Sequence, residues 1–226
     1  MDVMQIIKQD VLQLQSSRST PSRVAINGVE GSGKTTFAIA LTDFLIKEGL
    51  DAVHIGIDGF HFNKSRRYQQ GRDSAKGYYE DSYDELGFVN KVLIPSQDAA
   101  QPSYVPATHD LVSDEFLELE PILLSPQAVM ITDGAYLFKS SYQAHWDYKI
   151  FLKTELDVAM ARGVARDAVA LGGTDAARAK FLQRYHAASQ MYIDEYNPES
   201  LADLVVDNSN YDHPAILVHH TIECGT

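Results

Sequence analysis

The feature that most constrains this chain is the segment Gly28–Thr36, which reads GVEGSGKTT. It fits the spacing G-x-x-x-x-G-K-[S/T], in which glycines let backbone N–H groups approach a polyphosphate closely. The apolar run 24–26 precedes the segment, and Phe37, Leu41 and Phe44 follow it at helical spacing. A strand, a glycine loop and a helix in this order predict a phosphate-binding loop rather than a simple glycine-rich turn.

The motif also assigns roles within the loop. Lys34 is expected to reach the β- and γ-phosphates of ATP, and the Thr35 hydroxyl is expected to bind Mg²⁺. The backbone N–H groups and the positive end of the following helix dipole would hold the remaining phosphate charge. The residues expected to bind ATP are Gly28, Glu30, Gly31, Ser32, Gly33, Lys34, Thr35 and Thr36.

Two further segments are predicted to be strands that end in an acid. Residues 52–58 end at Asp58, and the more apolar run 128–133 ends at Asp133 in a Walker B pattern. In a parallel sheet, ligands bind at the carboxyl ends of the strands. We therefore expect Asp58 to face the phosphate loop, with a turn aspartate as the alternative. Asp133 is expected to hold Mg²⁺ together with Thr35.

The order of these elements predicts an α/β fold, because two parallel strands joined by a helix form a βαβ unit. The chain is expected to form one domain over residues 1–226, with an amphipathic helix at 2–16. Residues 82–94 are expected to be helical with Leu86, Val89 and Leu93 inward. Another helix is expected to start at Thr154 and Asp157, with Leu156, Met160 and Val164 on its buried face. The sequence pattern of residues 208–226 does not assign this C-terminal segment to a helix or a strand.

Composition limits the partners. The formal net charge of −12 argues against nucleic acid, whose phosphates need a basic face. Cys224 is the only cysteine, so no internal disulfide is expected, and it makes no convincing metal site with His219 and His220. No stretch suggests a membrane span, and charges break any signal-peptide core in residues 1–15. We expect a cytoplasmic protein, and a homo-oligomer remains open.

Two basic regions are candidates for anion or acceptor binding. Residues 59–81, which hold Arg66, Arg67, Arg72, Lys76, Tyr78 and Tyr79, are expected to cover an acceptor site, with a solvated loop as the alternative. Arg162 and Arg166 are four residues apart on one helix face, where like charges repel mildly. A shared anion would explain the pair, and a solvated basic edge is the alternative.

With these motifs located, the sequence from about Arg23 to Asn208 resembles the uridine kinase and phosphoribulokinase family of P-loop kinases. The resemblance rests on the phosphate loop and on ordered motifs of the uridine-kinase-like branch: Ile57-Asp58-Gly59-Phe60-His61, Tyr104 ahead of His109, Thr132-Asp133-Gly134, Arg162-x-x-x-Arg166-Asp167, Arg184-Tyr185, Gln190-x-Tyr192 and 202–208. It implies a three-layer α/β/α P-loop NTPase sandwich with a mainly parallel sheet.

The resemblance also implies the chemistry: transfer of the γ-phosphate of ATP, with Mg²⁺, to a hydroxyl of a small molecule. Asp58 would orient the hydroxyl and take its proton, while Lys34, Arg162 and Arg166 would neutralise charge. Phe60, His61, Tyr104 and His109 would surround the acceptor, and a lid would lie around residues 166–177.

The sequence departs from the uridine kinase pattern in two places. Asp133 stands where uridine kinases usually carry Glu, and the segment 171–174 lacks the usual arginine-rich run. Uridine or cytidine is the first expectation for the acceptor, with a sugar or a pantothenate-like alcohol as alternatives. A regulatory nucleotide switch is the rival from another class, but Asn63-Lys64-Ser65-Arg66 lacks the Asp of a guanine-reading Asn-Lys-x-Asp motif.

Overall fold

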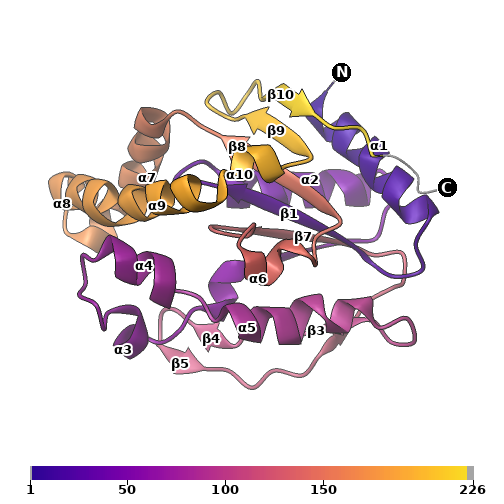
Figure 1. Ribbon diagram of the computed structural model, residues 1–226, viewed down its shortest axis with the longest axis horizontal. Helices are drawn as coiled ribbons and strands as arrows, with labels where there is room; N and C mark the ends of the chain where they lie inside the picture. The colour runs from indigo at the N-terminus through magenta and orange to yellow at the C-terminus, as the bar shows by residue number, and fades with distance from the viewer. Residues whose placement is uncertain (1, 223–226) are drawn as a thin grey trace.

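The structure is a computed structural model that describes residues 2–222. A six-stranded sheet in the order β10-β9-β8-β1-β7-β2 forms its centre (Figure 1). All neighbouring pairs are parallel except β9 and β10. The mainly parallel sheet is confirmed. Its strands are β1 (Ser22–Gly28), β2 (Ala52–Gly56), β7 (Val129–Gly134), β8 (Tyr148–Lys153), β9 (Leu204–Asp207) and β10 (Ala215–His219).

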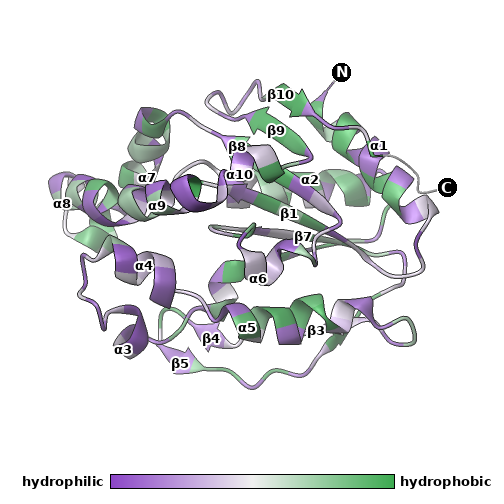
Figure 2. Cartoon of the chain, viewed as in Figure 1, coloured by the Kyte–Doolittle hydropathy of each residue, from purple (hydrophilic) through white to green (hydrophobic). Residues whose placement is uncertain are grey.

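Alternating strand residues supply two apolar cores on opposite faces of the sheet. Val24 and Ile26 of β1 pack with α1 (Val3–Ser16) and α2 (Lys34–Lys47) on one face. Ala25 lies in the other core with Tyr192 of α9 (His186–Tyr196). Helices therefore cover both faces in three layers, and Figure 2 shows β9 between them as hydrophobic. Helix α1 occupies the range where the sequence predicts a helix at 2–16.

The segment between β2 and β7 is mostly short elements. A 3₁₀ turn (Ile57–Phe60) leads to α3 (Lys64–Arg67), α4 (Ala75–Asp81) and α5 (Glu85–Phe88), which continues as a π-helix over Val89–Leu93 and a 3₁₀ turn over Pro95–Gln97. Two small antiparallel pairs follow. One pair is β3 (Ser103–Tyr104) with β6 (Ile122–Leu123), and the other is β4 (His109–Asp110) with β5 (Glu115–Phe116).

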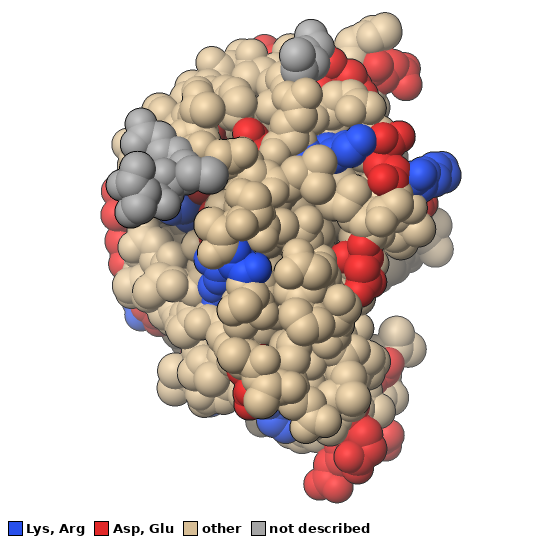
Figure 3. Space-filling view, turned by 90° about the vertical axis from the view of Figure 1, so that its right-hand side faces the viewer, with Lys and Arg blue, Asp and Glu red and all other residues tan. Residues whose placement is uncertain are grey.

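Helices also dominate the chain between β7 and β9. They are α6 (Ser140–Gln143), α7 (Leu156–Leu171), α8 (Thr174–Lys180) and α10 (Pro198–Leu201), with a π-helix at Phe181–Tyr185 leading into α9. Gly172 ends α7 in the left-handed conformation, with φ of 89°. No helix within residues 2–222 is long and apolar enough to cross a bilayer. On the face in Figure 3, lysine and arginine side chains are scattered rather than gathered.

Several local predictions are wrong. Strand β2 ends at Gly56, so Asp58 lies in the 3₁₀ turn after the strand. Leu86, expected to point inward, is 69% exposed, whereas Val89 and Leu93 are buried as predicted, together with Phe88 and Val92. Helix α7 begins at Leu156 without a side-chain cap, and Leu156 is exposed. The Thr154 hydroxyl donates to the carbonyl of Ser32 instead of capping the helix.

The C-terminal segment extends the sheet. Strand β10 pairs with β9, with a bulge between Ile216 and Val218. Its His219 bonds Asp10 of α1 through Nε2, at 2.8 Å from Oδ2. This side chain therefore ties the last strand to the first helix. Cys224 lies outside the described residues.

Candidate active site

A cavity of about 520 Å³ opens at the carboxyl ends of β1, β2 and β7. It brings together the phosphate loop, the turn after β2, the end of β7 and one side of α7. Its lining includes Glu30, Gly31, Gly33, Lys34, Thr35, Thr36, Asp58, His61, Asp133, Arg162 and Arg166. The predicted groups for ATP, for metal and for the acceptor hydroxyl thus share one space.

The phosphate loop is built on glycine conformations. Gly31 and Gly33 have φ of 84° and 91°, a region that side chains disfavour. A Cβ on Gly31 would also collide with the carbonyl oxygen of Ala159 in α7. From behind, the Ser32 carbonyl accepts hydrogen bonds from Asn208 Nδ2 at 2.8 Å and Thr154 Oγ1 at 3.3 Å. These contacts fix a loop shape that only the observed glycines allow.

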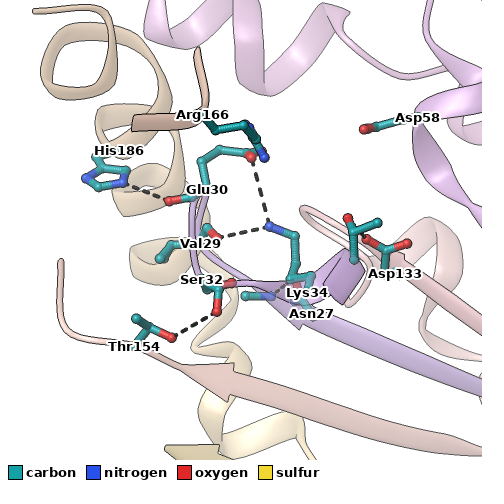
Figure 4. Close-up of polar contacts among 12 residues, drawn as sticks. Asn27, Val29, Glu30, Ser32, Lys34, Asp58, Asp133, Thr154, Arg166 and His186 are labelled. Carbon is teal, nitrogen blue, oxygen red and sulfur yellow. Dashed lines mark hydrogen bonds and ion pairs between the residues drawn. The ribbon is translucent and has the colours of Figure 1, made fainter. Parts of the chain in front are cut away.

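Lys34 begins α2 and folds back over the loop. Its Nζ donates to the Val29 carbonyl at 3.0 Å and lies 3.9 Å from Glu30 Oε2. Figure 4 shows Lys34 beside Val29 and Glu30, with Asp58 across the opening. The amine is therefore held at the end of the cavity where the N-terminus of α2 favours anions.

Thr35 and Asp133 form the candidate metal pair. The Thr35 hydroxyl donates to Asp133 Oδ2 at 2.6 Å, and His54 Nε2 lies 2.6 Å from Oδ1 of the same carboxylate. Burial alone would raise the pKa of Asp133, but the hydrogen bonds from His54 and Thr35 outweigh it and lower the pKa. A deprotonated carboxylate beside a hydroxyl oxygen suits Mg²⁺, which usually takes few protein ligands besides phosphates and water.

Asp58 faces the same cavity from the 3₁₀ turn. Its Oδ1 accepts a hydrogen bond from the Tyr83 hydroxyl at 3.3 Å and lies 3.9 Å from His61 Nδ1. Although 70% of the side chain is exposed to the cavity, surrounding protein raises the pKa of Asp58, and Glu30 and Asp133 add to the effect. His61 donates through Nδ1 to the Asp58 carbonyl at 2.8 Å, which fixes the turn. Desolvation lowers the pKa of His61, so its ring stays neutral near pH 7.

The arginine- and tyrosine-rich segment supplies part of the opposite wall. Arg67 of α3 and Tyr78 of α4 line the cavity. Arg67 is buried, and its Nη2 donates to Asp114 Oδ1 at 3.3 Å. The other members of the segment lie elsewhere: Arg66 stacks on Phe62, Arg72 lies near Tyr68, Lys76 pairs with Glu80 and Tyr79 bonds Glu195.

Three residues predicted to surround the acceptor do not line the cavity. Phe60 is fully buried and packs edge-on against Phe88 at 4.9 Å between ring centroids. Tyr104 lies in the core of the same face of the sheet. His109 is a buried residue of β4, with Nε2 3.3 Å from Asp114 Oδ1. Asp114 also accepts a hydrogen bond from Arg67, which lines the cavity. His109 is therefore linked to the cavity through the side chains of Asp114 and Arg67.

Both predicted arginines line the cavity, but protein groups already engage them. Arg162 donates to the carbonyls of Asn208 and Ser209 at 2.9 Å and stacks on Tyr211 at 3.8 Å. Arg166 is 64% exposed and pairs with Asp167 through two hydrogen bonds. That pairing raises the pKa of Arg166 further above its ordinary value. The two guanidinium groups therefore do not share one partner here.

Sequence reasoning missed other residues of the site. Tyr83 and Tyr211 line the cavity, and His54 bonds the metal-side carboxylate. Tyr185 and Asp167 also line it; the sequence motifs included them but gave them no role. His54 carried a usable signal, since it is a polar residue inside an otherwise apolar strand next to the one that ends in Asp133. Tyr83 and Tyr211 come from irregular segments, which give no periodic pattern.

Comparison with known proteins agrees with this architecture. The model of the "Phosphoribulokinase / Uridine kinase family" matches residues 24–211. A uridine kinase of Leuconostoc citreum (strain KM20) is 29% identical over 150 residues, which cover 65% of this chain and 69% of that protein.

Solved structures show the same fold. A possible uridine kinase from Bacillus stearothermophilus superposes with a TM-score of 0.65 at 18% identity, covering 88% of this chain and 98% of the other. A protein provisionally described as a fructose transport system kinase, from Silicibacter sp. TM1040, superposes with a TM-score of 0.69 at 24% identity, covering 86% of this chain and 95% of the other. The match of the family model over most of the chain shows that this protein belongs to the phosphoribulokinase/uridine kinase family.

Proposed function

We propose that the protein transfers the γ-phosphate of ATP, with Mg²⁺, to a hydroxyl of a small molecule, and that this acceptor is a nucleoside such as uridine or cytidine. The observation that carries the proposal is the shared cavity: Lys34 and Asp58 both line it, and Figure 4 shows them across its opening from each other. One space can therefore hold a phosphate donor and a hydroxyl together.

The protein would act mainly by positioning and by neutralising charge, because phosphoryl transfer has a loose, in-line transition state. Lys34 and the N–H groups at the start of α2 would stabilise negative charge on the transferred group. Thr35 and Asp133 would hold Mg²⁺, which supplies further charge neutralisation when bound. Asp58 would aim the acceptor hydroxyl and take its proton as the new bond forms.

Arg162 and Arg166 would join this machinery through the lid proposed around residues 166–177. Support comes from the junction of α7 and α8, where Gly172 and Gly173 have φ of 89° and 116°. A Cβ at either glycine would lie more than 4 Å from every neighbouring group in the described part of the chain. The open space around the junction suits a hinge for this lid, and Arg166 lies on α7 just before the junction.

The nucleoside acceptor is supported by the uridine kinase of Leuconostoc citreum, which is similar over two thirds of its length. A sugar is the second candidate, and the fold match to the Silicibacter protein favours it. A regulatory nucleotide switch is less well supported, because Asp58 and Tyr83 would have no task in a protein without an acceptor.

A direct test measures ADP release with uridine, cytidine, fructose and pantothenate, each with ATP and Mg²⁺. Lys34→Ala serves as the blank, since it keeps the loop but removes its amine. We expect stimulation by a nucleoside well above the rate with ATP alone. A slow rate that no acceptor changes would contradict the kinase proposal and favour a switch.

A further inference from the structure

Glu30 places a carboxylate in the phosphate-binding loop, 3.9 Å from the amine of the lysine that is expected to attract phosphate. Its Oε1 accepts a hydrogen bond from the Tyr78 hydroxyl at 2.8 Å. Its backbone carbonyl accepts another from His186 Nε2 at 3.0 Å. Both anchors belong to elements outside the loop, α4 and α9, so the orientation of Glu30 is set by the wall opposite the loop.

The other carboxylates of the cavity already have partners or a task. Asp133 is bound by Thr35 and His54, and Asp167 is bound by Arg166. Asp58 is the group that faces an acceptor hydroxyl. The sequence places Glu30 in the loop expected to bind ATP, but its carboxylate accepts a hydrogen bond from Tyr78, and its nearest cationic nitrogen among the described residues, Lys34 Nζ, is 3.9 Å away, beyond hydrogen-bond distance.

The position of Glu30 favours the acceptor side of the cavity. A carboxylate directed only at the triphosphate would repel it, whereas the hydrogen bond from Tyr78 ties Oε1 of Glu30 to α4, on the wall opposite the loop. The carboxylate of Glu30 is close enough to Asp58 to contribute to the raised pKa of Asp58. Only 15% of the Glu30 side chain is exposed, so the space left for a partner is confined to the cavity.

We propose that Glu30 is a specificity-determining residue that binds the acceptor through hydrogen bonds from hydroxyls on adjacent carbons. An ionised carboxylate accepts through two oxygens, and Tyr78 occupies only one site on Oε1. Such a group selects the vicinal diol of a ribose or another sugar over an alcohol without adjacent hydroxyls, such as pantothenate. This inference rests on the proposed kinase function and narrows its acceptor class.

The test compares uridine with 2′-deoxyuridine in the wild type, in Glu30→Gln and in Glu80→Gln. Glutamine keeps the size and an oxygen for Tyr78 but loses the charge and one acceptor oxygen. Glu80 lies on α4 outside the cavity and pairs with Lys76, so it controls for the same change nearby. If fructose is the acceptor, the matched pair is the sugar and a deoxy analogue lacking one adjacent hydroxyl.

In the wild type and in Glu80→Gln, we expect kcat/KM for uridine to exceed that for 2′-deoxyuridine about 10- to 100-fold, the size of one hydrogen bond to a charged group. In Glu30→Gln the ratio should fall below about 3-fold. Calorimetric ATP affinity should be unchanged or tighter in Glu30→Gln, which also shows that the variant folds.

Three results would overturn the inference, and they differ from failure of the proposed function. An unchanged ratio in Glu30→Gln would show that Glu30 does not bind the diol. A more than tenfold loss of ATP affinity would place Glu30 on the nucleotide side. If pantothenate is the only compound of the panel that is phosphorylated, the acceptor needs no adjacent hydroxyls and the proposed role of Glu30 is wrong. If no acceptor stimulates ADP release by the wild type, the kinase proposal itself fails.

Discussion

The hydroxyl of Thr35 donates a 2.6 Å hydrogen bond to Oδ2 of Asp133 and so joins the start of α2 to the end of β7. The register of the sheet makes this contact possible, since Asp133 pairs with Ile26 of β1 and Gly56 of β2. Of the two oxygens of the candidate metal site, one therefore comes from strand β7 and the other from the start of α2, just after β1, while His54, which orients the carboxylate, comes from β2 next to β7.

Asp133→Asn should weaken the response to Mg²⁺ more than metal-free nucleotide binding. The substitution removes the charge that attracts the cation, while Lys34 and the loop N–H groups remain. The measurement is a Mg²⁺ titration of the rate at saturating ATP, with nucleotide affinity in EDTA as the control. If the titration curves of variant and wild type coincide, Asp133 is a structural acid only.

Lys34→Ala should keep the fold and lower kcat about 10²–10³-fold, because it removes a preorganised charge from the transferred phosphate. The fold should survive because, within residues 2–222, the amine has one hydrogen bond, to the Val29 carbonyl, and a loose ion pair with Glu30 at 3.9 Å. Steady-state rates and a thermal melt test both statements. Near-normal turnover of Lys34→Ala would show that Lys34 does not take part in phosphoryl transfer.

The pH profile should reflect the raised pKa of Asp58. A raised pKa means that the carboxylate becomes protonated at a higher pH than an ordinary aspartate, so activity should fall earlier as the pH decreases. In Tyr83→Phe, loss of the donated hydrogen bond should move this acid limb to still higher pH. The check is kcat/KM against pH for both proteins. An acid limb at the same pH in both would show that Tyr83 does not stabilise the ionised carboxylate.

Asp147→Ala should destabilise the fold strongly. Asp147 accepts hydrogen bonds from the backbone N–H, Nε and Nη2 of the buried Arg23 and also pairs with Arg18. Removing it leaves a buried guanidinium unpaired, which typically costs about 3–5 kcal/mol. Denaturant unfolding gives the free energy, and Asp73→Ala, in a surface pair with Lys180, should leave it nearly unchanged. Equal losses of unfolding free energy in the two variants would show that the pairing of Asp147 with the buried Arg23 has no special role in stability.

The phosphate loop and Asp133 were predictable because their signals are local. A contiguous motif fixes the loop, and an apolar run that ends in an acid fixes the strand end. Asp58 lines the same cavity as the phosphate loop, as expected, although β2 ends two residues earlier than predicted. Strand β10 was not predictable, since it is short and a bulge interrupts its alternation.

The acceptor wall was harder to predict for a physical reason. Phe60 and Tyr104 have the residue types of a binding wall, but short elements of two to four residues do not show which side faces the core. Tyr83 and Tyr185 lie in a bridge and a π-helix, where the helical period is lost. Arg67 depends on Asp114, 47 residues away, and no local pattern reports such a contact.

The central claim is that Asp58 acts on the acceptor and not on ATP. The most direct test pairs calorimetric ATP affinity with kcat at saturating substrates for Asp58→Asn. We predict nearly unchanged ATP affinity and a loss in kcat of about 10²–10⁴-fold, the usual contribution of a general base. Collapse of ATP affinity with a surviving kcat would place Asp58 on the nucleotide side and contradict the account.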